Sequence, residues 1–352
     1  MLRKGRISLV LVLTLTVLLA GCQTPVEQAE ERTKEVFAMD TYFTLTAYGE
    51  QADAALDLAE QEIRRLEKMW SVTQPDSELY AINHREGSYT PVSQDTMELI
   101  AYAKQMAQET NDALDPTIYP VVRAWGFTTG EYRIPSQEEI DQLVQSVNYE
   151  SISLTDDAVM IPEAAQLDLG AVAKGDTGDR VAELLKAQGV TSALLNLGGN
   201  VQAVGAKPDG AKWRVGIRDP YSEAMLGVLE VEDAAVITSG GYERYFTGED
   251  GVNYWHILDP ATERPADSGL VSVTVVGREG KYCDALSTAL FVMGLEDASA
   301  YWREHQDFDM ILMTEQGDLY LTQGIQDCFT LSETHQDLPI YTINKISSGG
   351  NL

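Results

Sequence analysis

The sequence predicts an α+β fold, because helical patterns dominate its first half and strand patterns its second half. Apolar residues recur at helical spacing over much of 51–188, whereas short segments with strand character follow one another between 192 and 276. A GxGxxG segment does not follow any predicted strand, so the pattern does not indicate a Rossmann dinucleotide site. A linker rich in glycine, serine or proline is also missing from 36–345, so this region forms one large domain or two coupled ones.

The first half begins with a predicted strand, which several helices follow. Residues 36–48 alternate well enough between apolar and polar side chains to form a strand. Ser93 and Ser136 occupy the N-cap positions of two later helical patterns, where a hydroxyl can accept a hydrogen bond from a free backbone N–H. Gly189 follows the last pattern, as glycine commonly does at the end of a helix. The predicted helices span 51–70, 93–109, 136–147 and 174–188.

The second half is predicted to be rich in strands, with a pair of helices before the last of them. The helices are expected at 284–294 and 296–305. This partial segregation of strands and helices favours α+β over a regular βαβ repeat. The strands are expected at 192–197, 201–205, 213–217, 226–232, 234–238, 252–258, 270–276, 309–314 and 318–322.

The N-terminus has the features of an export signal. Basic residues precede an apolar run over 7–20, which is too short for a comfortable membrane span and fits a signal peptide. The run ends in Ala20-Gly21-Cys22, which resembles a lipoprotein processing site with Cys22 as the lipidated first residue; the alternative is an ordinary signal peptide. We expect a lipoprotein signal peptide over 1–21, a tether over 22–35, and a location at the extracytoplasmic face of the cell membrane.

The chain is strongly acidic, with 55 aspartates and glutamates against 25 lysines and arginines and a formal net charge of −30. This excess argues against nucleic acid as a partner, because phosphates need basic groups. It also argues against binding to an anionic lipid surface, so we expect contact with the membrane through the lipid anchor only. An anionic ligand would need local compensation from a metal, a lysine or helix N-termini.

Cysteine and histidine offer little metal chemistry in this chain. Beyond Cys22, Cys283 and Cys328 remain, and they either pair in an oxidising compartment or stay reduced. At least one of them is expected to be a buried thiol. The histidines are scattered along the chain, so a histidine-rich metal site is not expected.

Residues 167–181 form the most informative segment of the sequence. An apolar lead-in delivers Asp168, and small residues follow as far as Gly175, with Lys174 among them. Small residues let a ligand approach the backbone, and the start of a helix offers unpaired N–H groups to an anion. The segment therefore predicts a phosphate site, and the alternative is a plain turn from a strand into a helix.

Residues 282–291 contain a second chemical signal. If this segment is helical, Asp284 and Thr288 lie one turn apart on the same face. A carboxylate and a hydroxyl offer the hard oxygen ligands that Mg²⁺ prefers, and substrate phosphate often completes its coordination. The alternative is a capping aspartate beside a buried threonine.

Two further segments have both a functional and a structural interpretation. His256 lies within an apolar strand pattern, where it is either a core histidine or a proton carrier that contacts a ligand. Trp125-Gly126-Phe127 carries aromatic side chains that either stack on a planar ring or pack in the core. The glycine-containing segment 238–244 is by itself typical of a turn.

These segments, in this order, resemble the ApbE-type flavin transferases, the FAD:protein FMN transferases, over roughly residues 36–325. The lipoprotein signal at the start of the chain also fits the cellular location that is usual in that family. The matching pieces are Met39-Asp-Thr41, Pro75-Asp-Ser-Glu78, Leu114-Asp-Pro-Thr117, Trp125-Gly-Phe127, Asp168-Leu-Gly-Ala-Val-Ala-Lys-Gly175, Asn196-Leu-Gly-Gly-Asn200, Thr238-Ser-Gly-Gly241, His256-Ile-Leu-Asp-Pro260 and Asp284-Ala-Leu-Ser-Thr-Ala289.

The resemblance implies a T-fold-like architecture of mixed and antiparallel sheets flanked by helices. It implies a catalytic domain of two intertwined subdomains over 36–345 and a flexible tail over 346–352. The implied reaction passes FMN from FAD to a threonine or serine hydroxyl of an extracytoplasmic acceptor protein, with Mg²⁺ as cofactor and AMP as the leaving group. Two alternatives stay open: hydrolysis of FAD to FMN and AMP, and flavin binding by a lipoprotein without turnover.

The resemblance also implies roles for individual residues. The Mg²⁺ ligands would be the backbone carbonyl of Ala171, the carboxylate of Asp284 and the hydroxyl of Thr288. As the base for the attacking hydroxyl, Asp284 ranks before His256. The expected FAD contacts are Met39, Trp125, Gly126, Phe127, Asp168, Lys174, His256 and Ile257.

Two positions depart from the pattern of the family. Many relatives have a flavin-stacking tyrosine where this chain has Thr73, and Trp70 or Tyr80 would have to replace it. Cys283 precedes the proposed metal ligand where alanine is common, and a small apolar filler is the simplest interpretation of this thiol.

Overall fold

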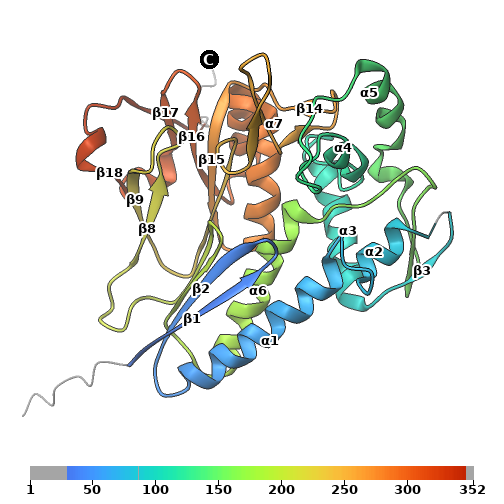
Figure 1. The fold of residues 1–352 in the computed structure, drawn as a ribbon. Coiled ribbons are helices and arrows are strands. Elements are labelled where there is room, and N and C mark those ends of the chain that lie inside the picture. The colour runs from blue at the N-terminus through green and yellow to red at the C-terminus, as the bar shows by residue number, and fades with distance from the viewer. Residues whose placement is uncertain (1–29, 86, 346–352) are drawn as a thin grey trace, which may run out of the picture.

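The structure is a computed structural model that describes residues 30–85 and 87–345 (Figure 1). The predicted signal peptide over 1–21, the predicted lipidation site Cys22 and the tail over 346–352 lie outside these residues. In the part of the chain that is described, no helix combines the length and the apolar character that crossing a membrane requires.

A nine-stranded sheet runs through the molecule in the order β1-β2-β6-β7-β10-β15-β16-β17-β19. Neighbouring strands pair antiparallel, except that β17 and β19 pair parallel. This mixed sheet and the helices beside it confirm the α+β prediction. Its strands are β1 (Glu31–Ala38), β2 (Thr41–Tyr48), β6 (Ala193–Leu197), β7 (Asn200–Val204), β10 (Ala235–Gly240), β15 (Leu270–Gly277), β16 (Asp309–Thr314), β17 (Leu319–Thr322) and β19 (Ile340–Ile343).

Two layers cover the faces of this sheet (Figure 1). Helices α1 (Ala52–Trp70), α6 (Gly170–Ala187) and α7 (Gly280–His305) pack on one face, and a small sheet packs on the other. Strand β10 shows the alternation that this requires, since Ala235 and Ile237 join the helical core and Val236 joins the core under the small sheet. That sheet contains β8 (Trp213–Arg218), β9 (Met225–Val231) and β18 (Phe329–Leu331).

Further helices extend the helical side and form its outer part. They are α2 (Glu78–Asn83), α3 (Gln94–Glu109), α4 (Tyr119–Ala124) and α5 (Gln137–Leu143), with 3-10 turns at Val144–Ser146 and Tyr149–Ser151. Two more 3-10 turns, Gln323–Ile325 and Glu333–His335, lie on the side of the small sheet. The small strands are β3 (Thr90–Pro91), β4 (Ser153–Leu154), β5 (Ala158–Met160), β11 (Tyr245–Thr247), β12 (Asn253–Trp255), β13 (Leu258–Asp259) and β14 (Arg264–Pro265).

The predicted helix caps are confirmed. Ser93 accepts a hydrogen bond from the N–H of Thr96 at 3.3 Å, and Ser136 accepts one from the N–H of Glu139 at 3.2 Å. Helix α6 ends at Ala187, and Gly189 follows with a φ of 84°, the left-handed conformation that glycine adopts easily.

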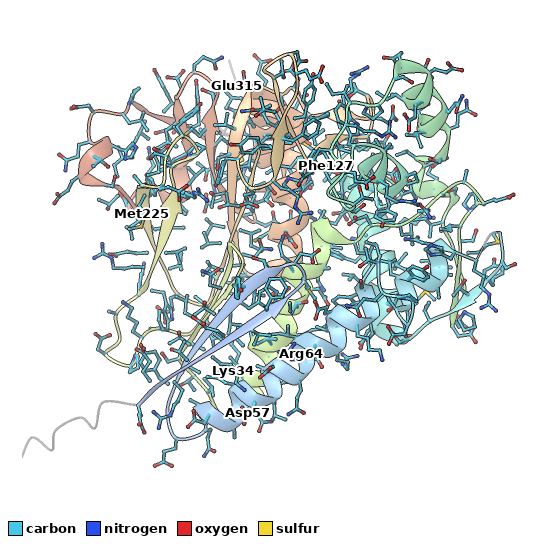
Figure 2. The ribbon with its side chains drawn as sticks, in the orientation of Figure 1. Lys34, Asp57, Arg64, Phe127, Met225 and Glu315 are labelled. Carbon is cyan, nitrogen blue, oxygen red and sulfur yellow. The ribbon has the colours of Figure 1, made fainter. Side chains whose placement is uncertain are left out.

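The expected single strand over 36–48 is wrong. The segment is the end of a β1–β2 hairpin, because Met39 and Asp40 both have positive φ and reverse the chain. Strand β1 begins at Glu31, so the predicted end of the tether at residue 35 is also wrong. Lys34 is held there by ion pairs with Asp57 and Glu60 of α1, and Figure 2 shows Lys34 beside Asp57.

Other boundaries also differ from the predictions, and the state of the two cysteines, which the sequence left open, is now defined. Helix α6 begins at Gly170, four residues before the predicted start at 174. Its small residues allow the helix to pack closely against α7. The predicted strand over 252–258 divides into β12 and β13, which belong to separate two-stranded sheets. The two predicted helices after residue 284 are confirmed as the two segments of α7, which begins at Gly280 and is interrupted by non-helical backbone at Gly294. Cys283 and Cys328 are both free thiols.

Helices α6 and α7 cross at a pair of glycines. A Cβ on Gly175 would overlap the carbonyl oxygen of Gly280, and a Cβ on Gly280 would lie 2.7 Å from the carbonyl oxygen of Gly175. Asp179 of α6 accepts hydrogen bonds from the N–H groups of Gly280 and Lys281 at 2.6 and 2.9 Å. The first turn of α7 is therefore held against the side of α6.

We predict that Gly175→Ala lowers the free energy of unfolding by about 1–3 kcal/mol, because the added methyl group overpacks this crossing. Gly178→Ala is the matched control on the same helix, since its Cβ would meet the end of the Leu197 side chain at 3.2 Å and Gln202 at an ordinary contact distance of 3.8 Å. The control should be neutral or stabilising, because alanine exceeds glycine in helix propensity by about 1 kcal/mol. Urea unfolding measures both, and equal losses would contradict the special role of Gly175.

Candidate active site

A cavity of about 580 Å³ opens where the hairpin turn, α6, α7 and the outer helical part meet. A volume of this size is typical of a site for a cofactor or a substrate of similar size. Most of the predicted site residues line it together, although they come from distant parts of the sequence. They are Met39, Phe127, Asp168, Ala171, Lys174, His256, Ile257, Asp284 and Thr288.

Asp284 is buried at the inner end of this site, on the first turns of α7. One carboxylate oxygen accepts a hydrogen bond from the backbone N–H of Gly175 at 2.8 Å, and the other accepts one from the side-chain amide of Asn200 at 2.9 Å. Burial raises the pKa of Asp284, while Lys174 and these hydrogen bonds lower it. A carboxylate with two oxygens keeps lone pairs beyond these bonds for a cation.

The bond from Gly175 also affects the carbonyl of Ala171. In a regular helix the N–H of residue 175 donates to the carbonyl of residue 171, four positions earlier. Here that N–H donates to Asp284. The carbonyl oxygen of Ala171, a residue that lines the cavity, therefore competes with a carboxylate for this donor and keeps capacity for another partner.

Thr288 lies one turn after Asp284, as the spacing predicts. Its hydroxyl is 3.3 Å from the hydroxyl of Ser239, which is also 2.8 Å from that of Ser287. Ser287 in turn donates to the backbone carbonyl of Asp284 at 2.9 Å. Ser239, at the end of β10, therefore joins a hydroxyl network that orients Thr288.

The donor set of Ala171, Asp284 and Thr288 fits Mg²⁺. All three offer oxygen, which a small hard cation prefers, and Mg²⁺ usually takes few protein ligands and completes its shell with water and phosphate. Within 30–85 and 87–345, no group of three or more histidine, cysteine, aspartate and glutamate residues could hold a metal. The described residues thus hold no cluster of the nitrogen and sulfur ligands that zinc prefers.

Two cationic residues, Lys174 and Arg244, line the cavity with Asp284. Of the five further acidic residues that line it, Asp168 and Glu243 are the ones whose pKa both cations affect. Burial raises the pKa of Asp168 and of Glu243, and the nearby positive charges lower both. The carboxylate of Asp168 is held in place by the N–H of Gly170 at 2.6 Å.

His256 is half-buried in the wall of the cavity and stays neutral at physiological pH. Burial, together with Arg244 and Lys174, lowers its pKa to about 3. Its Nδ1 lies 3.1 Å from the backbone carbonyl of Arg244, which can only accept a hydrogen bond. Nδ1 therefore carries the proton, and a group with so low a pKa is a weak base.

Trp125 and Gly126 are not among the residues that line the cavity, so the structure does not bring them together with the other predicted site residues. Trp125 is fully buried and donates its indole N–H to the carbonyl of Glu263 at 2.9 Å. Gly126 has a φ of 86°, and the carbonyl of Glu131 occupies the place of a Cβ. Trp125 packs in a core cluster with Val121, Phe127, Ile140 and Leu258.

Phe127 is the member of that segment that reaches the cavity, and Figure 2 places it near α4. It packs against Tyr132 with ring centroids 5.7 Å apart, and Tyr132 also lines the cavity. Trp70 and Thr73 line it too, whereas Tyr80 instead stacks on His84. Of the two proposed replacements for a flavin-stacking tyrosine, Trp70 is therefore the one in position.

The sequence reasoning missed several residues of the cavity. The segment 238–244, which by itself is typical of a turn, supplies Ser239, Glu243 and Arg244 to the cavity. Its succession of glycine and charged residues is the sequence signal that could have indicated them. Asn200 belongs to a matching piece of the resemblance, but its contact with Asp284 has no local sequence signal. Asp40 and Glu67 also line the cavity.

Comparisons with known proteins identify the family of this chain. A model of the ApbE family matches residues 39–312. A FAD:protein FMN transferase from Klebsiella pneumoniae (strain 342) is 34% identical over 268 residues, covering 74% of this chain and 83% of the relative. The crystal structure of the ApbE protein from Thermotoga maritima superposes with a TM-score of 0.78 at 29% identity, covering 88% of this chain and 99% of that one.

A flavin transferase ApbE structure from Vibrio cholerae is also similar, with a TM-score of 0.77 at 27% identity and coverage of 85% of this chain and 99% of that one. The fold and the cavity thus define a protein of the flavin transferase class. This chain belongs to the ApbE family.

Proposed function

We propose that this chain transfers FMN from FAD to a threonine or serine hydroxyl of an acceptor protein, with Mg²⁺ as cofactor and AMP as the leaving group. The observation that carries the proposal is the meeting, in one cavity, of three oxygen donors, two cations and an apolar wall with aromatic rings. The relatives named FAD:protein FMN transferase support the same reaction.

The charges of the cavity suit a pyrophosphate. Lys174 and Arg244 provide positive charge where an anionic substrate would otherwise meet a protein with a net charge of −30. In a site that excludes water, such fixed charges stabilise charge that grows on a transferring phosphoryl group. Phe127, Tyr132 and Met39 provide the apolar surface that a flavin ring requires.

The oxygen donors would hold the metal ion. Ala171, Asp284 and Thr288 would bind it, and Asn200 and the N–H of Gly175 hold the carboxylate of Asp284 in place. When bound, Mg²⁺ supplies Lewis-acid stabilisation of the phosphate oxygens. Asp284 remains the first candidate to accept the proton of the attacking hydroxyl, because the low pKa of His256 disfavours that residue as a base.

The alternatives differ in what happens to FMN. Hydrolysis releases FMN and AMP, whereas transfer leaves FMN on the acceptor. A binding protein without turnover would release neither, and it would have no need for the oxygen donors beside the cations. The donor set therefore favours an enzyme over simple flavin capture.

Mass spectrometry of an acceptor domain tests the proposal. With FAD and Mg²⁺, the wild-type chain should add one FMN to the acceptor, while excess EDTA or the change Asp284→Asn should reduce the rate by at least about 100-fold. Asparagine keeps the size and one hydrogen-bond acceptor of Asp284, so its fold should persist, and circular dichroism checks this. Free FMN with an unmodified acceptor would refute transfer, and full activity in EDTA would refute the metal.

Lys174 is predicted to recognise the phosphates of FAD. Lys174→Met should weaken FAD binding by about tenfold or more, because it removes a charge-assisted contact, but it should barely change the affinity for riboflavin. Lys207→Met is the control, since Lys207 lies over the ring of Trp213 and outside the cavity. Fluorescence titration measures both ligands, and equal weakening of the two would contradict the role of Lys174.

We further propose that the mature protein is anchored by a lipid on Cys22 at the extracytoplasmic face of the membrane. The supporting observation is the run of basic and apolar residues that ends in Ala20-Gly21-Cys22. Metabolic labelling with a palmitate analogue should mark the wild-type chain and not Cys22→Ser. Equal labelling, or recovery of both proteins in the soluble fraction, would contradict the anchor.

A further inference from the structure

The turn between β1 and β2 adopts a conformation that its residues do not favour. Ala38 pairs with Thr41, so the turn has two residues, Met39 and Asp40, with φ of 50° and 60°. Positive φ at both positions is the signature of a type I′ turn, which strongly prefers Asn-Gly. A methionine in this region is strained, because its Cβ crowds the backbone, and such strain persists only where surrounding contacts hold it.

One of these contacts comes from α1. The carboxylate of Glu67 accepts a hydrogen bond from the backbone N–H of Met39 at 2.9 Å. Glu67 lies in the last turn of α1, and among the ion pairs between described residues none involves it. A part-buried carboxylate without a cationic partner is costly, so its one hydrogen bond to the turn calls for a functional explanation.

A second contact supports the turn from the other side. Thr41 rests on Gly198, whose Cβ would overlap the threonine side chain. The sulfur of Met39 lies 3.9 Å from the hydroxyl of Thr177 on α6. The turn is thus held between α1, α6 and the β6–β7 connection, and the side chain of Met39 faces the cavity wall.

Met39, Asp40 and Glu67 all line the cavity. We infer that Glu67 is a positioning residue: its hydrogen bond holds the Met39–Asp40 turn in the left-handed conformation, and the turn presents Met39 as a fixed wall for the bound flavin nucleotide. The identity of that ligand rests on the proposed function. Loss of the bond lowers the population of the binding-competent turn and weakens the apparent affinity in proportion.

Direct contact between Glu67 and the ligand is the competing explanation, and a double-mutant cycle separates the two. Glu67→Ala should raise the Kd for FAD by about tenfold. In an Asp40→Gly background, where glycine adopts positive φ without strain, the same change should alter Kd by less than about twofold. An equal loss of affinity for FAD in both backgrounds would overturn the inference. A glycine that favours the turn conformation cannot compensate for a lost contact between Glu67 and the ligand.

Glu60→Ala is the matched control on the same helix. Glu60 also links α1 to the hairpin, through Lys34 at 2.9 Å, but it lies outside the cavity. This change should lower the midpoint of thermal unfolding and leave the Kd for FAD unchanged. If it weakens FAD binding as much as Glu67→Ala does, general loosening of the hairpin explains the result and the inference fails.

A measurement without ligand keeps the inference separate from the proposed function. In protein labelled with ¹³C-methyl methionine, the Met39 signal, assigned with Met39→Leu, should shift and broaden in Glu67→Ala. It should return toward its original position in Glu67→Ala with Asp40→Gly. Failure of the wild-type chain to bind FAD would count against the proposed function alone, whereas an unchanged Met39 signal in Glu67→Ala would overturn the inference.

Discussion

The close crossing of α6 and α7 is the constraint on which the site depends. Two glycines, Gly175 and Gly280, bring the helix backbones into contact, and this lets Asp284 accept a hydrogen bond from the N–H of Gly175. The carboxylate thus competes with the carbonyl of Ala171 for that N–H. A larger side chain at either glycine would separate the helices and with them the two halves of the oxygen donor set. The close packing of the two helices and the arrangement of the proposed metal ligands thus have a single physical origin.

Positive charge inside the cavity explains how an acidic protein can bind an anionic substrate. The net charge of −30 is a property of the whole chain, whereas binding depends on the field inside one cavity. There, Lys174 and Arg244 stand among carboxylates whose pKa values burial raises. Within the described residues these carboxylates form no ion pair, so they favour the binding of a cation in the cavity. A bound cation in turn favours the binding of a pyrophosphate. The cavity therefore suits metal and nucleotide together better than either alone.

The cavity also depends on backbone conformations that cost free energy. Gly126 and Gly198 adopt positive φ where neighbouring groups leave no room for a Cβ, and the Met39–Asp40 turn does so without glycine. Such conformations concentrate at sites where the geometry of a wall matters more than local stability. The hydrogen bond from Met39 to Glu67 and the contact of Thr41 with Gly198 show how surrounding elements hold this turn.

The sequence by itself determined the fold class, most helices and their caps, and the pairing of Asp284 with Thr288, because these follow from spacing along one element. It also pointed to the small residues near Lys174, although not to the early start of α6 at Gly170. Only the tertiary structure decided that Trp125 is packed while Phe127 faces the cavity, that Asn200 holds Asp284, and that Arg244 joins Lys174. Each of these depends on contacts between residues far apart in the chain. A local sequence pattern does not specify on which side of a packed layer a distant residue will lie.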